Sequence, residues 1–121
     1  MNDRAQRLRK QFDLSEVSFL TKMRPDMIWD VEAFERLTGD MLEYCREAKG
    51  DSQLVDRDLA YGFWFFPAYV RRWTSHPSFP RQYSGQYYEE AYRRLDDLAY
   101  WFFSGHSPYL AGHVWEPIRP C

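Results

Sequence analysis

A chain of 121 residues with 45% hydrophobic side chains is long enough to form one domain that buries a core without disulfides or metal. Its net charge of −2 excludes a strongly basic nucleic-acid-binding protein, and its two cysteines exclude a disulfide framework. The longest apolar run, residues 59–70, is shorter than the roughly 20 residues of a membrane span. Residues 1–12 lack the apolar stretch of a secretory signal. We therefore expect a soluble, cytoplasmic protein.

The first quarter of the chain contains two short helical patterns. Residues 1–12 place apolar side chains on one face of a helix and basic side chains on the other. Ser15 is suited to cap a second short helix, which must end before Pro25 because the residue preceding proline resists helical angles.

The next helix is predicted to start at Asp26 or Asp30 and to run to Lys49. Its apolar residues recur at three- and four-residue spacing and form one stripe. Gly39 lies inside this pattern, and a glycine in a helix interior costs about 1 kcal/mol relative to alanine. The helix can therefore kink or break at Gly39.

Two longer helices follow. Asp51 or Ser52 opens a segment whose helix, Leu59–Trp73, is apolar nearly all round, as is usual for a buried central helix. Pro67 is expected to kink it or to start a fresh helix. The helix Ser84–Phe103 begins with a serine cap and carries two ion pairs at i,i+4 spacing, Glu89 with Arg93 and Glu90 with Arg94.

Proline and glycine mark the remaining segments as non-helical. Two prolines make residues 74–83 the longest internal loop, and residues 106–121 carry further prolines and a glycine. The sequence thus predicts a single all-α domain over residues 1–121, a compact bundle of four to five helices with an extended C-terminal tail packed across it.

Catalytic and metal-binding patterns are weak throughout the sequence. The three histidines, His76, His106 and His113, match no zinc spacing. Cys45 lies on a buried stripe, where an inert thiol is expected, and Cys121 is terminal and expected to be reactive. The sequence favours a protein without catalytic activity, cofactor or metal.

Charge is distributed unevenly along the chain, with a net +3 over residues 1–25, −6 over 26–58 and +1 over 59–121. Acidic residues recur opposite the apolar stripe of the 26–49 helix. They are either a solvated helix face, which charge runs usually are, or a docking face for a basic partner. The candidate partner-binding residues are Glu32, Glu35, Asp40, Glu43 and Glu47, with Asp51, Asp56 and Asp58 as extensions.

The short length, the absence of a reactive constellation and the segregated acidic charge favour a protein-binding function. In this general character the chain resembles the small acidic immunity proteins with which bacteria block their own nuclease toxins. The resemblance implies an inhibitor that masks a basic protein through its acidic helix face. The net negative charge argues against a nucleic-acid partner, and the short apolar run argues against a membrane partner. The sequence leaves the oligomeric state open.

The alternative function belongs to another class, a small-ligand-binding protein or an enzyme. Its site would be an aromatic groove between the helices Leu59–Trp73 and Ser84–Phe103, beneath the 74–83 loop. Such grooves bind ligands when a few polar groups converge in them. The candidate groove residues are Arg72, Trp73, His76 and Tyr83.

Overall fold

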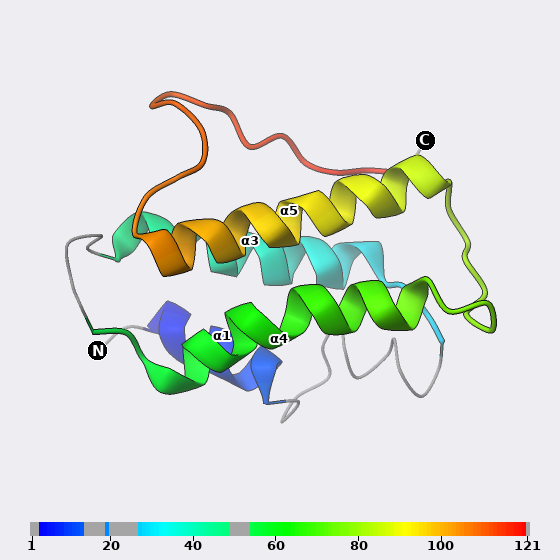
Figure 1. The fold of residues 1–121 in the computed structure, drawn as a ribbon, viewed down its shortest axis with the longest axis horizontal. Helices are drawn as coiled ribbons and strands as arrows, with labels where there is room; N and C mark the ends of the chain where they lie inside the picture. The colour runs from blue at the N-terminus through cyan, green and yellow to red at the C-terminus, as the bar shows by residue number, and fades with distance from the viewer. Residues whose placement is uncertain (1–2, 14–18, 20–26, 49–53, 121) are drawn as a thin grey trace.

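A computed structural model of the protein describes residues 3–13, 19, 27–48 and 54–120. These residues form helices and no strand, which confirms the all-α class. Four helices lie side by side (Figure 1): α1 (Asp3–Phe12), α3 (Val31–Glu47), α4 (Arg57–Thr74) and α5 (Gly85–Ser104). Helix α1 packs against α3 and α4, and α5 packs against the same two helices from the other side. The predicted second short helix falls mainly on residues outside the described ones.

Side-chain caps fix the starts of three helices. Asp30, Asp56 and Ser84 each accept a hydrogen bond from the amide three residues later, at 3.0, 3.1 and 3.2 Å. Each cap satisfies an amide of the first turn that has no partner inside the helix. The sequence predicted the cap at Ser84 and gave Asp30 as one of two possible starts of α3, but it missed the cap at Asp56 and placed the opening of that segment too early.

Neither Gly39 nor Pro67 interrupts its helix. Helix α3 runs through Gly39 and helix α4 runs through Pro67 without a break, so the expected breaks do not occur. Both helices bury apolar side chains before and after these residues. Packing along the whole helix outweighs the cost of about 1 kcal/mol for glycine and the lost hydrogen bond of proline.

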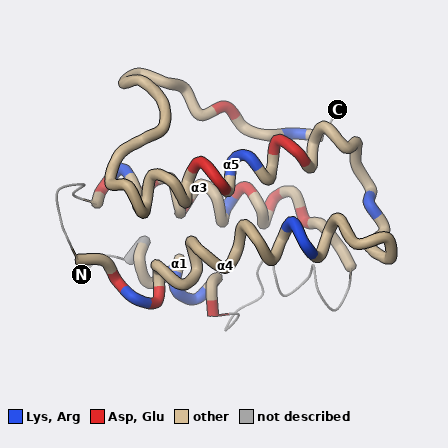
Figure 2. Tube along the Cα trace, viewed as in Figure 1, with Lys and Arg blue, Asp and Glu red and all other residues tan. Residues whose placement is uncertain are grey.

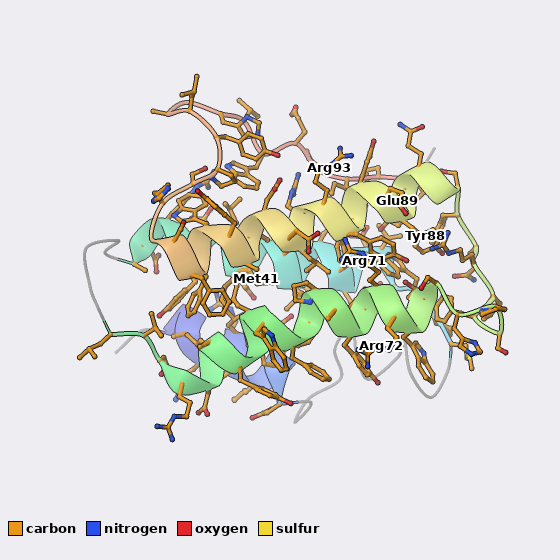
Figure 3. All side chains as sticks on the ribbon, in the orientation of Figure 1. Met41, Arg71, Arg72, Tyr88, Glu89 and Arg93 are labelled. Carbon is orange, nitrogen blue, oxygen red and sulfur yellow. The ribbon has the colours of Figure 1, made fainter. Side chains whose placement is uncertain are left out.

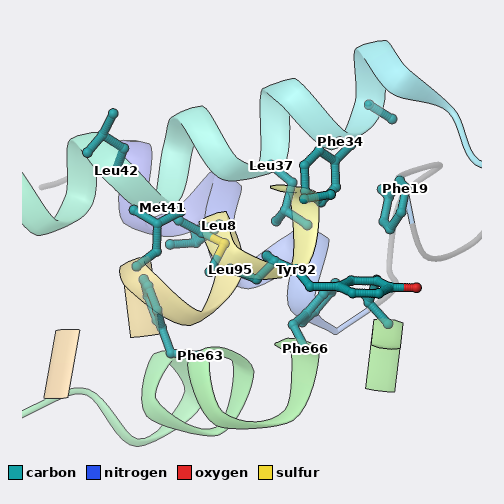
Figure 4. Close-up of a cluster of buried hydrophobic side chains, with 14 of the residues drawn as sticks. Leu8, Phe19, Phe34, Leu37, Met41, Leu42, Phe63, Phe66, Tyr92 and Leu95 are labelled. Atoms are coloured by element: carbon teal, nitrogen blue, oxygen red, sulfur yellow. The ribbon is translucent and has the colours of Figure 1, made fainter. Parts of the chain in front are cut away.

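One hydrophobic core joins all four helices (Figure 4). Its fully buried side chains come from each of them: Leu8 of α1, Leu37 and Met41 of α3, Phe63 and Phe66 of α4, and Leu95 of α5. Aromatic rings also meet in the core and at its edge, where the buried Phe63 stacks on the partly buried Phe102 with ring centroids 4.3 Å apart. Most of the aromatic side chains therefore lie in the core or pack against it, although some remain exposed.

Residues 106–120 follow α5 on its outer side without forming a helix (Figure 1). Trp115 stacks on Trp101 of α5 at 5.9 Å, and the guanidinium of Arg94 lies 5.4 Å from the Trp115 ring. Arg119 then reaches the carboxylates of α3. This segment thus contacts two helices through Trp115 and Arg119, whereas its apolar side chains Leu110 and Val114 remain exposed.

Candidate functional site

Two carboxylates of the predicted acidic face hold an arginine from the far end of the chain. Arg119 donates to Glu32 at 2.6 Å and forms an ion pair with Glu35 at 2.9 Å. The hydrogen bond to Glu32 raises the pKa of Arg119, so the guanidinium stays charged. The first turn of α3 is therefore occupied by a cation of the protein itself.

Other acidic residues of α3 also have basic or polar partners. Asp40 accepts hydrogen bonds from Arg7 at 3.4 Å and Gln11 at 2.9 Å, which links α3 to α1. Glu43 pairs with Arg46 one turn later on the same helix. Acidic residues outnumber basic ones along this helix (Figure 2), but arginines of the same helix, of α1 and of the C-terminal segment pair with several of them, so its outward charge is smaller than the count of carboxylates suggests.

Asp56 has a structural role at the start of α4. It caps the helix and forms an ion pair with Arg9 of α1. The hydrogen bond from Arg9 lowers the pKa of Asp56 and raises that of Arg9. Of the remaining candidates, Glu47 and Asp58 are exposed near helix ends, and Asp51 lies outside the described residues.

The space beneath the 74–83 loop is filled by the loop's own side chains. Phe79 is buried there. Arg81 donates to the carbonyl of Thr74 at 3.0 Å and to the hydroxyl of Tyr92 at 2.9 Å. Thr74 uses its single hydroxyl proton on a backbone carbonyl, so the 2.5 Å contact between the two hydroxyls is a bond donated by Tyr92.

The four residues of the alternative groove are not brought together. Arg72 lies on the side of α4 away from α5, whereas Arg71 lies toward α5 (Figure 3). His76 accepts a hydrogen bond from the amide of Ser78 at 3.1 Å within the loop. The two aromatic members pack on separate helices, Trp73 against Tyr69 and Tyr83 against Tyr87.

A groove does lie between α4 and α5, but toward the ends of the helices remote from the 74–83 loop. It is open, has a volume of about 580 Å³, and is lined from both helices. Pro67 and Ala68 of α4 and Ala99 of α5 are among its lining residues. Because the two alanines have short side chains, the helices leave a hollow between them there.

Exposed aromatic rings surround this hollow. Trp64 is 65% exposed, Phe103 54% and Tyr100 49%. Tyr61, 58% exposed, lies beside Trp64, with the two ring centroids 5.9 Å apart. Such a contiguous apolar patch, unlike single exposed apolar residues, commonly marks an interaction site. We call these four residues and the hollow the aromatic groove.

An ion pair closes the loop-side end of the aromatic groove. Arg71 of α4 donates to Asp96 of α5 at 2.8 Å, and the Arg71 guanidinium also lies 5.1 Å from the ring centre of Tyr92 (Figure 3). The groove thus combines apolar walls with one positive and one negative charge side by side.

The aromatic groove corrects one interpretation of the sequence. Helix α4 is apolar nearly all round, but it is not the central buried helix, because Tyr61 and Trp64 are exposed. The pattern that could have revealed the groove was present: aromatic side chains on more than one face of a helix exceed what a single core can cover.

Cys45 is buried, as predicted, and burial raises the pKa of its thiol to about 12. It is therefore protonated and unreactive at neutral pH. Cys121 lies outside the described residues. Among the described residues, no group of three or more His, Cys, Asp and Glu side chains is placed to hold a metal ion.

Comparisons with known proteins found no similar family model, no similar curated protein and no similar solved structure. Within the described parts of the chain, none of the helices has the length and apolar character needed to cross a membrane.

Proposed function

We propose that the protein is a protein-binding module and that the aromatic groove is its binding face. The observation that carries this proposal is the exposure of Trp64, Tyr100 and Phe103 around one hollow. Tryptophan and tyrosine supply most of the binding energy in many interfaces, where they fill pockets and exclude water. Their retention on the surface here, in a chain with a well-filled core, is what a binding face requires.

The shape of the aromatic groove favours a protein over a small ligand. Small-molecule sites enclose most of the ligand surface and aim a few unpaired polar groups at it. This groove is open, and Arg71 is engaged by Asp96. The carboxylate of Asp96 also makes the groove a poor site for a nucleic-acid phosphate.

A second candidate is the function expected from the sequence, an inhibitor or immunity-type protein that masks a basic partner in the cytoplasm. One observation favours it: Glu32 and Glu35 together hold the guanidinium of Arg119. The same two carboxylates would accept an arginine of a partner if the C-terminal segment moved aside. Reversal of both to lysine should then abolish capture of the basic partner, and unchanged capture would contradict this candidate.

The experiment for the aromatic groove is capture of partners from a lysate of the source cells. Trp64→Ala with Phe103→Ala removes two exposed rings, and Leu110→Ala is a control that removes an exposed apolar side chain elsewhere. We expect the double variant to lose proteins that the control retains, at both low and high salt, because apolar contacts are not screened. Identical capture by the two variants would contradict the proposal.

A further inference from the structure

We infer that the aromatic groove binds a second copy of this chain, in a symmetric dimer whose two-fold axis runs along the groove. This inference rests on the proposed function and names the partner. A two-fold interface uses the same surface on both copies, so that surface must be complementary to itself in charge and in shape. The aromatic groove meets the charge requirement, and its exposed rings face one another under the same axis.

The charges of the aromatic groove are self-complementary. Arg71 and Asp96 lie opposite each other on antiparallel helices, 2.8 Å apart. A two-fold axis parallel to α4 and α5 places each α4 against the α5 of the second copy at the same level. Arg71 of each copy then faces Asp96 of the other, and the two ion pairs join in an alternating ring of four charges.

The same axis also brings the exposed aromatic rings of the two copies together. Trp64 protrudes from α4 beside a hollow bordered by Ala99. The symmetry operation brings Trp64 of one copy to the level of Tyr100 and Phe103 on the other. The exposed rings of the two copies can therefore pack on each other and exclude water, and the four helices of the interface form a bundle of the kind that antiparallel helix pairs commonly build.

The charge of the surroundings also suits a second copy. Residues 59–70 of α4 contain no charged side chain, and the one ion pair leaves the groove neutral (Figure 2). A surface that binds a strongly charged partner carries charge of the opposite sign, and the neutral aromatic groove carries no such excess. A net charge of −2 per chain produces only weak repulsion between two copies.

The first test is sedimentation velocity of the purified chain over a range of concentrations. We expect the wild type to sediment as a monomer–dimer equilibrium and Trp64→Ala to weaken its association by about 30-fold or more, the effect of a typical hot-spot residue. Leu110→Ala should leave the equilibrium unchanged. A wild type that is monomeric at every concentration would overturn the inference.

The second test separates this interface from any other by reversing its charges. Arg71→Glu makes the ion-pair end of the groove negative, and Asp96→Arg makes it positive, so each variant alone should be monomeric. A mixture of the two should form a heterodimer, because every facing pair is then of opposite sign. Arg72→Glu is the control, since Arg72 lies on the other side of α4, and it should associate like the wild type.

The outcomes distinguish the inference from the proposed function. If the mixture stays monomeric while the wild type dimerises, the dimer uses another surface and the inference is wrong. If the wild type is monomeric but Trp64→Ala with Phe103→Ala loses partners from the lysate, the aromatic groove binds a different protein and only the inference fails. If neither self-association nor capture responds to these substitutions, both proposals fail.

Discussion

The outward face of α3 and the aromatic groove of α4 and α5 both expose a surface that differs from the one their sequences suggest, but in opposite ways. Helix α3 carries many carboxylates, but arginines from distant parts of the chain return to it. Arg7 is 33 residues from its partner Asp40, and Arg119 is 87 residues from Glu32. The count of charges along one helix therefore overstates the potential of its surface, because partners remote in sequence neutralise it.

The aromatic groove shows the opposite case. Helix α4 contacts α1 on one side and α5 on another, so a sector of its surface has no neighbour among the described helices. Aromatic residues in that sector, such as Trp64, remain exposed although the sequence pattern suggests a buried helix. An exposed aromatic surface is thus hard to recognise in the sequence because its pattern resembles that of a core, whereas the number of carboxylates overstates the acidic surface.

Substitutions of two glycines, one in α4 and one in α3, give the largest expected effects on stability. Gly62 of α4 lies under the ring of Phe12, and a Cβ added to Gly62 would clash with that ring. Gly62→Ala should therefore destabilise the protein by about 1–3 kcal/mol, as overpacking does. Gly39 of α3 has no atom within 4 Å of an added Cβ, so Gly39→Ala should stabilise by about 0.5–1 kcal/mol.

Urea unfolding monitored by circular dichroism measures both glycine variants under one set of conditions. Effects of opposite sign would establish that α4 is closely covered by α1 at Gly62 while α3 is open to solvent at Gly39. A neutral or stabilising Gly62→Ala would contradict the close approach of Phe12 to α4.

The next largest effect is expected at Asp56, which the sequence assigned to partner binding. Asp56→Ala removes the cap of α4 and its ion pair with Arg9, and should cost about 1–2 kcal/mol at pH 7. Asp58→Ala is the control, because Asp58 lies in the first turn of the same helix without the capping role. It should cost no more than the roughly 0.3–1 kcal/mol of a charge near a helix N-terminus.

The same substitution has a defined pH dependence. The pKa of Asp56 is lowered in the folded protein, chiefly by the hydrogen bond from Arg9, so the folded state favours the charged form. That stabilisation is complete above the unfolded pKa of about 3.9 and is lost as the pH falls through the lower folded pKa. The difference in unfolding free energy between wild type and Asp56→Ala should narrow from pH 5 to pH 3, and a constant difference would contradict the lowered pKa.

The parts of the fold that local chemistry determines could be predicted from the sequence. The cap at Ser84 was predicted, and Asp30 was one of the two predicted starts of α3, because each cap depends on a few neighbouring residues. Gly39 was misjudged because packing over a whole helix outweighs one unfavourable residue. The aromatic groove could not be located, because it depends on which sector of α4 its neighbours leave uncovered.

The smallest expected effect is that of Arg119→Ala. This substitution should leave the folding stability unchanged but should change the rate at which the acidic face associates with a basic partner. Arg119→Ala removes two exposed ion pairs, and such pairs often contribute nothing measurable to folding, so the unfolding midpoint should not change. Glu32 and Glu35 would, however, lose their guanidinium. Association with an arginine-rich peptide should then accelerate by up to about tenfold at low salt, the lower end of electrostatic steering.

Arg93→Ala is the matched control for this effect, because it removes the same charge from an exposed position on α5. Stopped-flow mixing with a fluorescent peptide would measure both association rates. The advantage of Arg119→Ala over Arg93→Ala should vanish near 1 M salt, where the Debye length falls to about 3 Å. Equal rates for the two variants at low salt would mean that Arg119 does not shield the acidic face, and that only the net charge of the protein governs its encounter with a basic partner.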